Sequence, residues 1–250
     1  MKFTRDLMGM PITVEIVDAA AKEKDAEAVF EYFKKVDEKF STYKQGSEIS
    51  KINRGEIKEK DFSEEMKAVF ELSAETKKLT NGYFDIVGQN GLYDPSGLVK
   101  GWAINNAAKI LDGRGFKNFY VEAGGDIQTS GENKEGKPWS VGIKNPFNQR
   151  EIVKAVYISG QGMATSGTYI RGQHIYNPHN RDKKIEDIVS LTVIGPNVYQ
   201  ADRFATAAFA MGKEGINFIE GLNNFEGYMI DSKGIATMTS GFKNHTIEKK

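Results

Sequence analysis

The sequence predicts an α+β protein in which mixed, largely antiparallel sheets pack against helices. Long amphipathic helical patterns dominate the chain up to Leu111, whereas short strand-like runs separated by Gly-, Asn- and Pro-containing turns follow from Asn118 onward. Helices and strands do not alternate regularly, so a doubly wound parallel sheet is not expected. Because neither an internal repeat nor a low-complexity linker divides the chain, we predict a single domain over residues 1–250.

The N-terminal half is predicted from hydrophobic spacing and from helix caps. Alternating apolar residues indicate a strand, and apolar residues three and four apart indicate helices. Ser47 and Ser63 are typical helix N-caps, and Asn81-Gly82 is a typical helix end. The predicted elements are, in order, a strand over 10–17, helices over 22–40, 47–53 and 63–80, a short strand over 83–87 and a helix over 98–111.

The C-terminal half is dominated by strand patterns, interrupted by one pair of helices. Apolar runs alternate with turns rich in Gly, Asn and Pro, which is typical of antiparallel strands. The predicted elements are strands over 119–122, 126–130, 139–144, 153–159, 164–168 and 188–194, helices over 198–211 and 213–221, and a closing hairpin over 226–231 and 235–239.

Composition excludes several classes of function. Lys+Arg and Asp+Glu are 34 each, so the chain has no general electrostatic reason to bind nucleic acid or an anionic membrane. The absence of Cys excludes disulfides, thiolate nucleophiles and Cys-ligated zinc. No signal-peptide pattern, and no run of about 18 apolar residues, is present. We therefore expect a cytoplasmic protein without a membrane anchor; an exported protein whose leader has been removed is the alternative.

Asp202 and Thr206 lie four residues apart in the predicted helix 198–211, so their side chains should share one face. Carboxylate and hydroxyl oxygens are hard ligands of the kind that Mg²⁺ takes, and a helix N-terminus suits a phosphate. We expect Asp202 to be exposed at the helix start. On spacing alone, an ordinary helix-start Asp with a packing Thr is the more common alternative.

Two further segments have features of phosphate-binding sites. Gly124-Gly125-Asp126 lies between two predicted strands, where glycines let a backbone approach a ligand closely; a plain hairpin turn is the alternative. Lys100 lies in the first turn of the predicted helix 98–111, where a cation is disfavoured unless an anion is nearby. The glycine-lysine-serine spacing of a P-loop is absent.

His174 follows the segment Thr165-Ser166-Gly167 and precedes an Asn-Pro turn, from which a side chain can reach a cleft. A solvated loop histidine is the alternative. The chain has no Gly-x-Ser-x-Gly elbow, which argues against a Ser-His-Asp hydrolase. His174 and His179 lie on a turn, where no helix places their side chains on one face. This argues against a zinc site.

The order of these motifs, rather than any one of them, resembles that of the ApbE family of FAD:protein FMN transferases. The similarity covers the chain from about residue 5 to residue 242. The motifs are Met8-Gly9-Met10, Phe40-Ser41-Thr42-Tyr43, Ser47-Glu48-Ile49-Ser50, Gly82-Tyr83-Phe84-Asp85-Ile86, the Val-Lys-Gly stretch of 94–103, the Gly-Gly-Asp of 123–126, Thr165-Ser166-Gly167, the His-containing 174–178 and the Asp-containing 201–206.

The resemblance implies a fold, a reaction and its partners. The fold would be ApbE-like, similar to the T-fold. Family members bind FAD and Mg²⁺, and they transfer the FMN half to a Ser or Thr hydroxyl of a target flavoprotein with release of AMP. Some also hydrolyse FAD to FMN and AMP. An FAD pyrophosphatase and a flavin-binding protein without turnover are therefore the alternatives.

The resemblance also implies roles for individual residues. Asp202 and Thr206 would bind Mg²⁺ through their side chains, and a backbone carbonyl near Gly97 would supply a third oxygen. His174 would assist the acceptor hydroxyl. Lys100 and Thr165-Ser166-Gly167 would lie near the pyrophosphate, and the FAD would be bordered by Tyr43, Ser47, Glu48, Gly124, Gly125 and Asp126. The sequence departs from the family pattern in a short connection over 87–96 and in Asn177, where Asp is usual.

Overall fold

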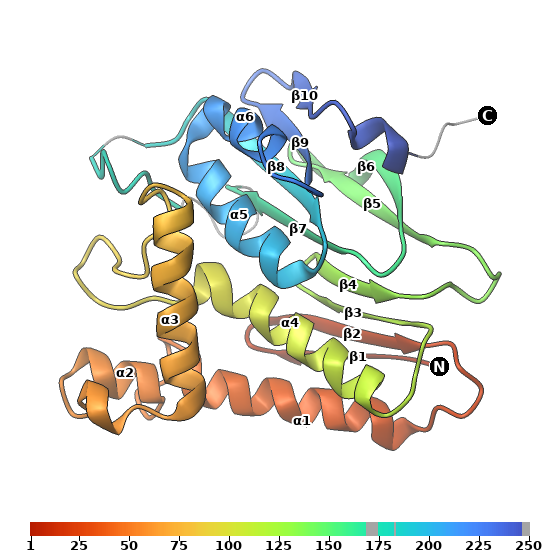
Figure 1. The fold of residues 1–250 in the computed structure, drawn as a ribbon, viewed down its shortest axis with the longest axis horizontal. Helices are drawn as coiled ribbons and strands as arrows, with labels where there is room; N and C mark the ends of the chain where they lie inside the picture. The colour runs from red at the N-terminus through yellow and green to blue at the C-terminus, as the bar shows by residue number, and fades with distance from the viewer. Residues whose placement is uncertain (169–174, 183, 247–250) are drawn as a thin grey trace.

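Helices and antiparallel strands make up the computed structural model, which describes residues 1–168, 175–182 and 184–246 (Figure 1). Within these ranges eight strands form one sheet in the order β1-β2-β3-β4-β7-β8-β9-β10, and each neighbouring pair is antiparallel. β5 and β6 form a second, two-stranded sheet. The strands are β1 (Lys2–Leu7), β2 (Met10–Ile16), β3 (Phe119–Ala123), β4 (Asp126–Ser130), β5 (Trp139–Asn145), β6 (Asn148–Ile158), β7 (Gly162–Gly167), β8 (Ile188–Gly195), β9 (Glu226–Asp231) and β10 (Ala236–Met238).

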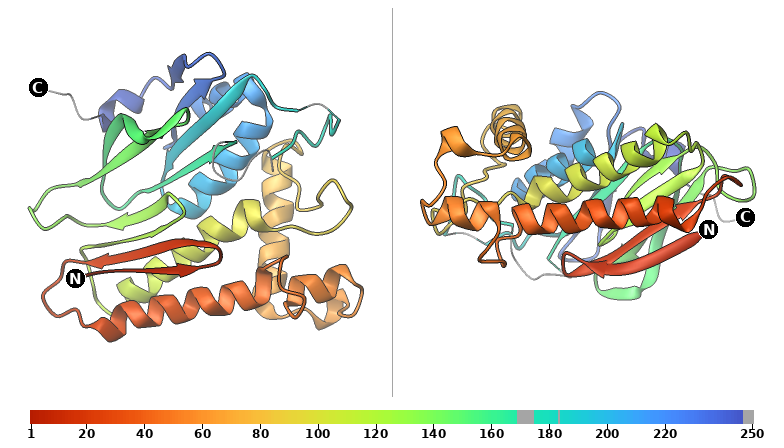
Figure 2. Two further views of the ribbon diagram at one scale, coloured as in Figure 1. Left: turned by 180° about the vertical axis from the view of Figure 1, so that it is seen from behind. Right: turned by 90° about the horizontal axis from the view of Figure 1, so that it is seen from below.

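The long helices α1, α4 and α5 cover one face of the large sheet, as the view from below in Figure 2 shows. None of the helices in the described residues is both long and apolar enough to cross a membrane. The helices are α1 (Glu23–Phe40), α2 (Glu48–Asn53), α3 (Glu64–Leu79), α4 (Ser96–Gly113), α5 (Val198–Ala210) and α6 (Gly215–Glu220), with 3₁₀ turns η1 (Glu59–Asp61), η2 (Gly212–Glu214) and η3 (Phe242–His245).

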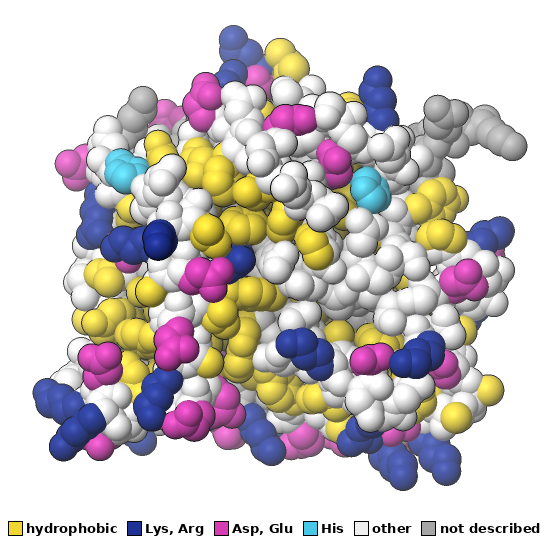
Figure 3. Space-filling model, in the orientation of Figure 1, with side chains coloured by type: hydrophobic (Ala, Val, Ile, Leu, Met, Phe, Trp, Pro, Cys, Tyr) yellow, Lys and Arg dark blue, Asp and Glu magenta, His cyan; other side chains and the backbone are white. Residues whose placement is uncertain are grey.

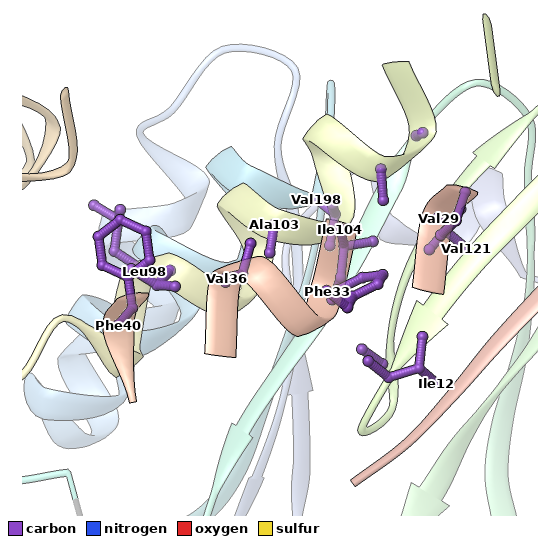
Figure 4. Close-up of a cluster of buried hydrophobic side chains, with 14 of the residues drawn as sticks. Ile12, Val29, Phe33, Val36, Phe40, Leu98, Ala103, Ile104, Val121 and Val198 are labelled. Carbon is purple, nitrogen blue, oxygen red and sulfur yellow. The ribbon is translucent and has the colours of Figure 1, made fainter. Parts of the chain in front are cut away.

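Apolar side chains are buried on both faces of the large sheet. On the helical side, Val29, Phe33 and Val36 of α1 face Ile104 of α4 and Val121 of β3 (Figure 4). Each such side chain, once fully buried, stabilises the fold by about 1.5–3 kcal/mol. Figure 3 shows this side of the molecule from outside, with apolar side chains gathered over its middle and charged ones mostly around its rim.

The other face of the sheet packs against the β5–β6 hairpin and η3. Successive residues of a strand point to opposite faces, so Ala164 of β7 lies under α5 while Met163 faces the hairpin. Trp139 of β5 belongs to this second layer, where its ring packs edge-on against Tyr120 of β3. The large sheet is therefore enclosed by helices on one side and by the small sheet on the other.

The predicted α+β class is confirmed, and so are the helix starts at Ser47 and Ser63, whereas α4 begins at Ser96 rather than at residue 98 and the predicted helix 213–221 is the 3₁₀ turn η2 followed by α6. The Ser47 hydroxyl accepts a hydrogen bond from the Ser50 N–H at 3.2 Å, and Ser63 accepts one from the Met66 N–H at 3.3 Å. These are the side-chain caps expected of serine at these positions.

Two further local predictions differ from the structure. The segment 83–87 is not a strand; only Val87 makes an isolated bridge, to Tyr93, because the chain folds back on itself through Gly88 and Gly91. Strand β1 was not predicted, since its hairpin turn consists of Met8 and Gly9, with φ values of 53° and 72°. Positive φ at both central residues suits the twist of a two-residue hairpin, but methionine rarely adopts it.

Candidate active site

A cavity of about 140 Å³ lies where the first turn of α4, the middle of α5 and the end of β7 meet. Most of its remaining wall comes from two loop segments, 83–88 and 175–178, and Asp94 and Gly124 complete it. The site therefore combines segments far apart in the chain, and the sheet and helices bring them together.

Gly101 sets how closely α4 and α5 approach beneath this cavity. Its N–H donates to Oδ2 of Asp202 at 2.7 Å. A Cβ at this position would lie 2.5 Å from Cβ of Asp202 and 2.7 Å from the carbonyl oxygen of Val198. Only glycine permits this contact, and no motif in the sequence predicted a separate role for Gly101.

Asp202 is buried, with 3% of its surface exposed, so the expectation of an exposed helix-start carboxylate is wrong. The helix begins at Val198, as predicted, after the N-cap Asn197, whose side chain accepts a hydrogen bond from the N–H of Gln200. Asp202 therefore lies in the second turn of α5 and faces α4 rather than solvent.

Three oxygen groups that the family resemblance associates with Mg²⁺ lie on one side of the cavity. The Thr206 hydroxyl donates to the Gly97 carbonyl at 3.2 Å, and Asp202 lies one helical turn away on the same face of α5. Among the described residues, no group of three or more His, Cys, Asp and Glu side chains could hold a metal. The donor set is a carboxylate, a hydroxyl and a carbonyl, which fits a hard cation that completes its shell with water and phosphate oxygens.

Lys100 lies between two buried carboxylates. Its Nζ is 2.7 Å from Oδ2 of Asp126 and 3.8 Å from Oδ1 of Asp202. The other oxygen of Asp126 accepts a hydrogen bond from the N–H of Thr165 at 3.0 Å. Asp126 thus connects α4 to β7 from behind the cavity.

Burial raises the pKa of Asp202 to about 7. The positive charge of Lys100 lowers this pKa, the negative charge of Asp126 raises it, and the Gly101 N–H lowers it. Loss of hydration disfavours the ionised carboxylate more than its partners favour it.

Segment 175–182 lies against segment 81–89 along the loop wall of the cavity. The Tyr176 hydroxyl donates to the Val87 carbonyl at 2.6 Å, and Nε2 of His179 is 2.8 Å from the Asn81 carbonyl oxygen. The ring of His179 also packs edge-on against Tyr83, with centroids 4.6 Å apart. Tyr176 and Tyr83 both line the cavity, and neither was predicted as a site residue from the sequence.

The structure brings together most of the predicted site residues. Eight of them line the cavity: Gly97, Lys100, Gly124, Thr165, Ser166, Gly167, Asp202 and Thr206. Gly124 and Gly125 have positive φ values of 59° and 98°, which lets the β3–β4 turn close sharply before Asp126. His174 lies outside the described residues.

The predicted FAD-bordering residues of the N-terminal half lie away from the cavity. Ser47 caps α2, and Glu48 accepts hydrogen bonds from the N–H and the hydroxyl of Ser63, both at 2.7 Å. Tyr43 is 96% exposed. Its neighbour Thr42 lines a second hollow of about 650 Å³, which shares Gly88, Asp94 and Tyr176 with the cavity. Contact of these residues with FAD stays a prediction.

Comparison with known proteins gives consistent results. The sequence model of the ApbE family matches residues 8–91 and 90–229. The FAD:protein FMN transferase of Escherichia coli K12 is 30% identical over 169 residues, which cover 63% of this chain and 48% of that protein. The Haemophilus influenzae enzyme of the same name is 29% identical over 170 residues, covering 63% and 49%. The matched region thus spans about half the length of these curated relatives.

Solved structures show the same fold at low sequence identity. The flavin transferase ApbE from Vibrio cholerae superposes with a TM-score of 0.85 at 22% identity, covering 98% of each chain. The ApbE protein from Thermotoga maritima gives a TM-score of 0.87 at 21% identity, covering 99% of each chain. With the family match extending over most of the sequence, the chain belongs to the ApbE family.

Proposed function

We propose that this protein transfers the FMN half of FAD to a Ser or Thr hydroxyl of a target flavoprotein and releases AMP. The names of its relatives support flavin transfer. The observation that carries the proposal is the convergence of Gly97, Asp202 and Thr206 beside Lys100 in one cavity. Attack on a pyrophosphate needs charge neutralisation and positioning more than covalent help from the protein, and these groups are suited to both.

Mg²⁺ fits the oxygen groups of this site. Asp202, Thr206 and the Gly97 carbonyl would hold the ion, since together they offer one charge and two neutral hard oxygens. When bound, Mg²⁺ supplies charge neutralisation to the pyrophosphate. The remaining positions of its shell would be available to phosphate oxygens and water.

The residues of the chain then position the reacting atoms. Lys100, 19% exposed at its side chain, would bind a non-bridging phosphate oxygen. The acceptor hydroxyl oxygen attacks the phosphorus of the FMN half, and the bond from that phosphorus to the bridging oxygen breaks. AMP leaves with the bridging oxygen, and the hydroxyl proton passes to a base, a role for which His174 stays the predicted candidate.

FAD requires more room than the cavity alone provides. Ligand sites typically measure about 300–1,000 Å³. The adjoining hollow of about 650 Å³ shares three lining residues with the cavity of about 140 Å³, so a ligand can extend from one into the other. This supports a substrate with two bulky halves joined by a pyrophosphate.

The test is incubation of the protein with FAD and Mg²⁺, with and without a flavoprotein domain that carries an acceptor Thr. AMP release with a fluorescent acceptor band in a denaturing gel is expected. AMP without a fluorescent band would indicate the FAD pyrophosphatase, and flavin binding without AMP would indicate a binding protein. The cytoplasmic location expected from the sequence stays a prediction.

A further inference from the structure

We propose that Asp126 is a positioning residue, which holds Lys100 away from Asp202 and so keeps Asp202 available to bind a divalent cation. The proposal rests on the proposed function, because it takes Asp202 as the cation ligand and Lys100 as the phosphate-binding group. Its basis is the geometry of one lysine between two buried carboxylates.

Asp126 acts from behind the cavity rather than within it. It is 1% exposed, and it is not among the residues that line the cavity, whereas Lys100 and Asp202 both are. Its two oxygens point to different elements: Oδ1 accepts the Thr165 N–H of β7, and Oδ2 lies 2.7 Å from Nζ of Lys100 on α4. A ligand in the cavity would therefore meet Asp126 through residues that line the cavity: through Lys100, its ion-pair partner, and through Asp202, whose side chain it also contacts.

Burying the charge of Asp126 also costs free energy of folding, and this cost indicates that the charge has a function. Removing an ionised carboxylate from water is unfavourable unless a close partner compensates. The main-chain bond to Thr165 could be made equally well by a neutral amide, since an Asn side chain also carries an acceptor oxygen. Among the described residues, the negative charge of Asp126 forms an ion pair with Lys100 at 2.7 Å, without the geometry of a hydrogen bond at Oδ2.

Lys100 has a second carboxylate within reach. Oδ1 of Asp202 lies 3.8 Å from Nζ, and the flexible four-carbon stem of lysine can close that gap. The other oxygen of Asp202 is already held by the Gly101 N–H at 2.7 Å. If Lys100 moved to Asp202, it would neutralise the carboxylate oxygen that remains for the cation, and it would leave the phosphate position.

The test measures Mn²⁺ binding without flavin, by the electron paramagnetic resonance signal of free Mn²⁺, together with kcat and KM for AMP release from FAD. The variants are D126N, K100M and K100M/D126N. The control is E122Q, which neutralises an acid of the same turn whose Oε1 accepts the Gly125 N–H at 2.6 Å. E122Q should bind Mn²⁺ as the wild type does.

D126N is expected to raise the Mn²⁺ Kd by about tenfold, as loss of a residue that supports a metal ligand usually does. K100M should bind Mn²⁺ at least as tightly as the wild type, because the competing cation is gone. In the K100M background, D126N should change the Mn²⁺ Kd by less than about twofold, since the two changes act on one interaction. Both single variants should raise the KM for FAD, because both remove Lys100 from the phosphate.

An equal loss of Mn²⁺ affinity on adding D126N to the wild type and to K100M would overturn the proposal, because Asp126 would then act independently of Lys100, on Asp202 or on the cation itself. Unchanged Mn²⁺ binding in D126N would overturn it too. If D126N alone fails to fold, K100M and the double variant, which removes the buried pair as a unit, still decide the question. The metal titration needs no turnover, so a wild type that binds Mn²⁺ but releases no AMP refutes the proposed function separately.

Discussion

Gly101 illustrates how a residue without a functional group can determine a site. Its missing side chain lets the Asp202 carboxylate approach the backbone of α4, and the N–H of Gly101 then fixes one carboxylate oxygen. The position of Asp202 therefore depends on a close helix-helix contact. A sequence pattern reveals the glycine but not the helix that crosses it.

We expect Gly101→Ala to destabilise the fold by about 1–3 kcal/mol, because the new methyl group would overlap Asp202 and the Val198 carbonyl. The same change at Gly113, in the last turn of α4, meets no atom within 4 Å and serves as the control. Urea denaturation of both variants is the measurement. Equal stability of the two variants would contradict the close packing of α4 and α5.

Burial of Asp202 determines which variant tests its role. Asp202→Ala would leave the Gly101 N–H without its acceptor, which costs about 1–3 kcal/mol, so lost activity could reflect lost structure. Asp202→Asn keeps an acceptor oxygen and removes only the charge. We expect it to lower Mg²⁺-dependent AMP release by about a hundredfold or more with little change in melting temperature. Retention of wild-type activity in this variant would exclude Asp202 as a metal ligand.

The sequence indicated which residues line the cavity better than it indicated the burial and charge contacts of those residues. Asp202, Thr206, Lys100 and Gly97, which were predicted because the order of motifs resembles a family, all line the cavity, and their roles stay predictions. Burial of Asp202 and its contact with Gly101 could not be predicted, since both depend on the crossing of α4 and α5, which are far apart in sequence. The contact of Lys100 with Asp126 likewise depends on how α4 lies over the sheet.

At the scale of elements, side chains tie the helices of the site to one another. Arg203 follows Asp202 but points toward α3, where its Nη1 lies 3.2 Å from Glu75 and 3.3 Å from Thr76. Its guanidinium group lies between the rings of Tyr199 and Phe204, at 4.8 and 4.7 Å from their centroids. These contacts hold α5 against α3 while its other side faces the cavity.

Arg203→Lys is expected to lower the free energy of unfolding by about 1–2 kcal/mol, because lysine loses the planar stacking and the multiple hydrogen bonds. Glu75→Gln should cost less than about 1 kcal/mol, since the Glu75 side chain is 54% exposed and surface ion pairs contribute little. Urea denaturation compares the two. A larger effect at Glu75 would show that the ion pair, rather than the stacking, holds α5.

Asp25 connects the start of α1 to the end of α4. Its Oδ2 accepts the Lys22 N–H at 2.9 Å, and its Oδ1 accepts from Nη1 of Arg114 at 2.7 Å. The Lys22 N–H and the Arg114 side chain together lower the pKa of Asp25 below the usual 3.8. Because the folded-state pKa is the lower one, this carboxylate stabilises the fold above pH 3.8, and the contribution is lost as the pH falls through the folded-state value.

We therefore expect Asp25→Asn to melt at a lower temperature than the wild type near neutral pH. The difference should shrink as the pH falls below 3.8 and vanish once Asp25 is protonated in the wild type as well. Thermal melts of both proteins across this range provide the measurement. A difference that stays constant with pH would contradict the ionic contribution of Asp25.

Elements with strong periodicity were predictable, and elements defined by long-range pairing were not. Helix α1 shows its apolar stripe in the sequence, and serine caps mark the starts of α2 and α3. Strand β1 is an edge strand with every second residue exposed, so it has little apolar signal of its own. The apolar residues of segment 83–87 lie in a loop that lines the cavity. The segment does not pair as a strand.

At the scale of the whole molecule, the large sheet joins both ends of the chain. Its first two strands come from residues 2–16 and its last two from residues 226–238, while α4 and α5 cross its middle in contact with each other. Apolar side chains fill both faces, so loss of the sheet would expose the helical side and the hairpin side together. The single domain predicted over residues 1–250 stays a prediction, and it implies that the two sides of the sheet unfold together.

The two tryptophans make that prediction testable, because they report on opposite faces of the sheet. Trp102 of α4 packs against Phe40 on the helical side, with ring centroids 5.7 Å apart, and Trp139 belongs to the cluster beneath the β5–β6 hairpin. The fluorescence of W102F reports on Trp139, and that of W139F reports on Trp102. In each variant, we expect denaturant to change the fluorescence in a single transition. This transition should coincide with the loss of helical circular dichroism in the same variant. Because each variant is compared with its own circular dichroism, a difference in stability between them does not affect the result. If Trp139 lost its native signal at a lower denaturant concentration than the helices, the hairpin layer would unfold on its own, and the chain would have to be described as two cooperative units.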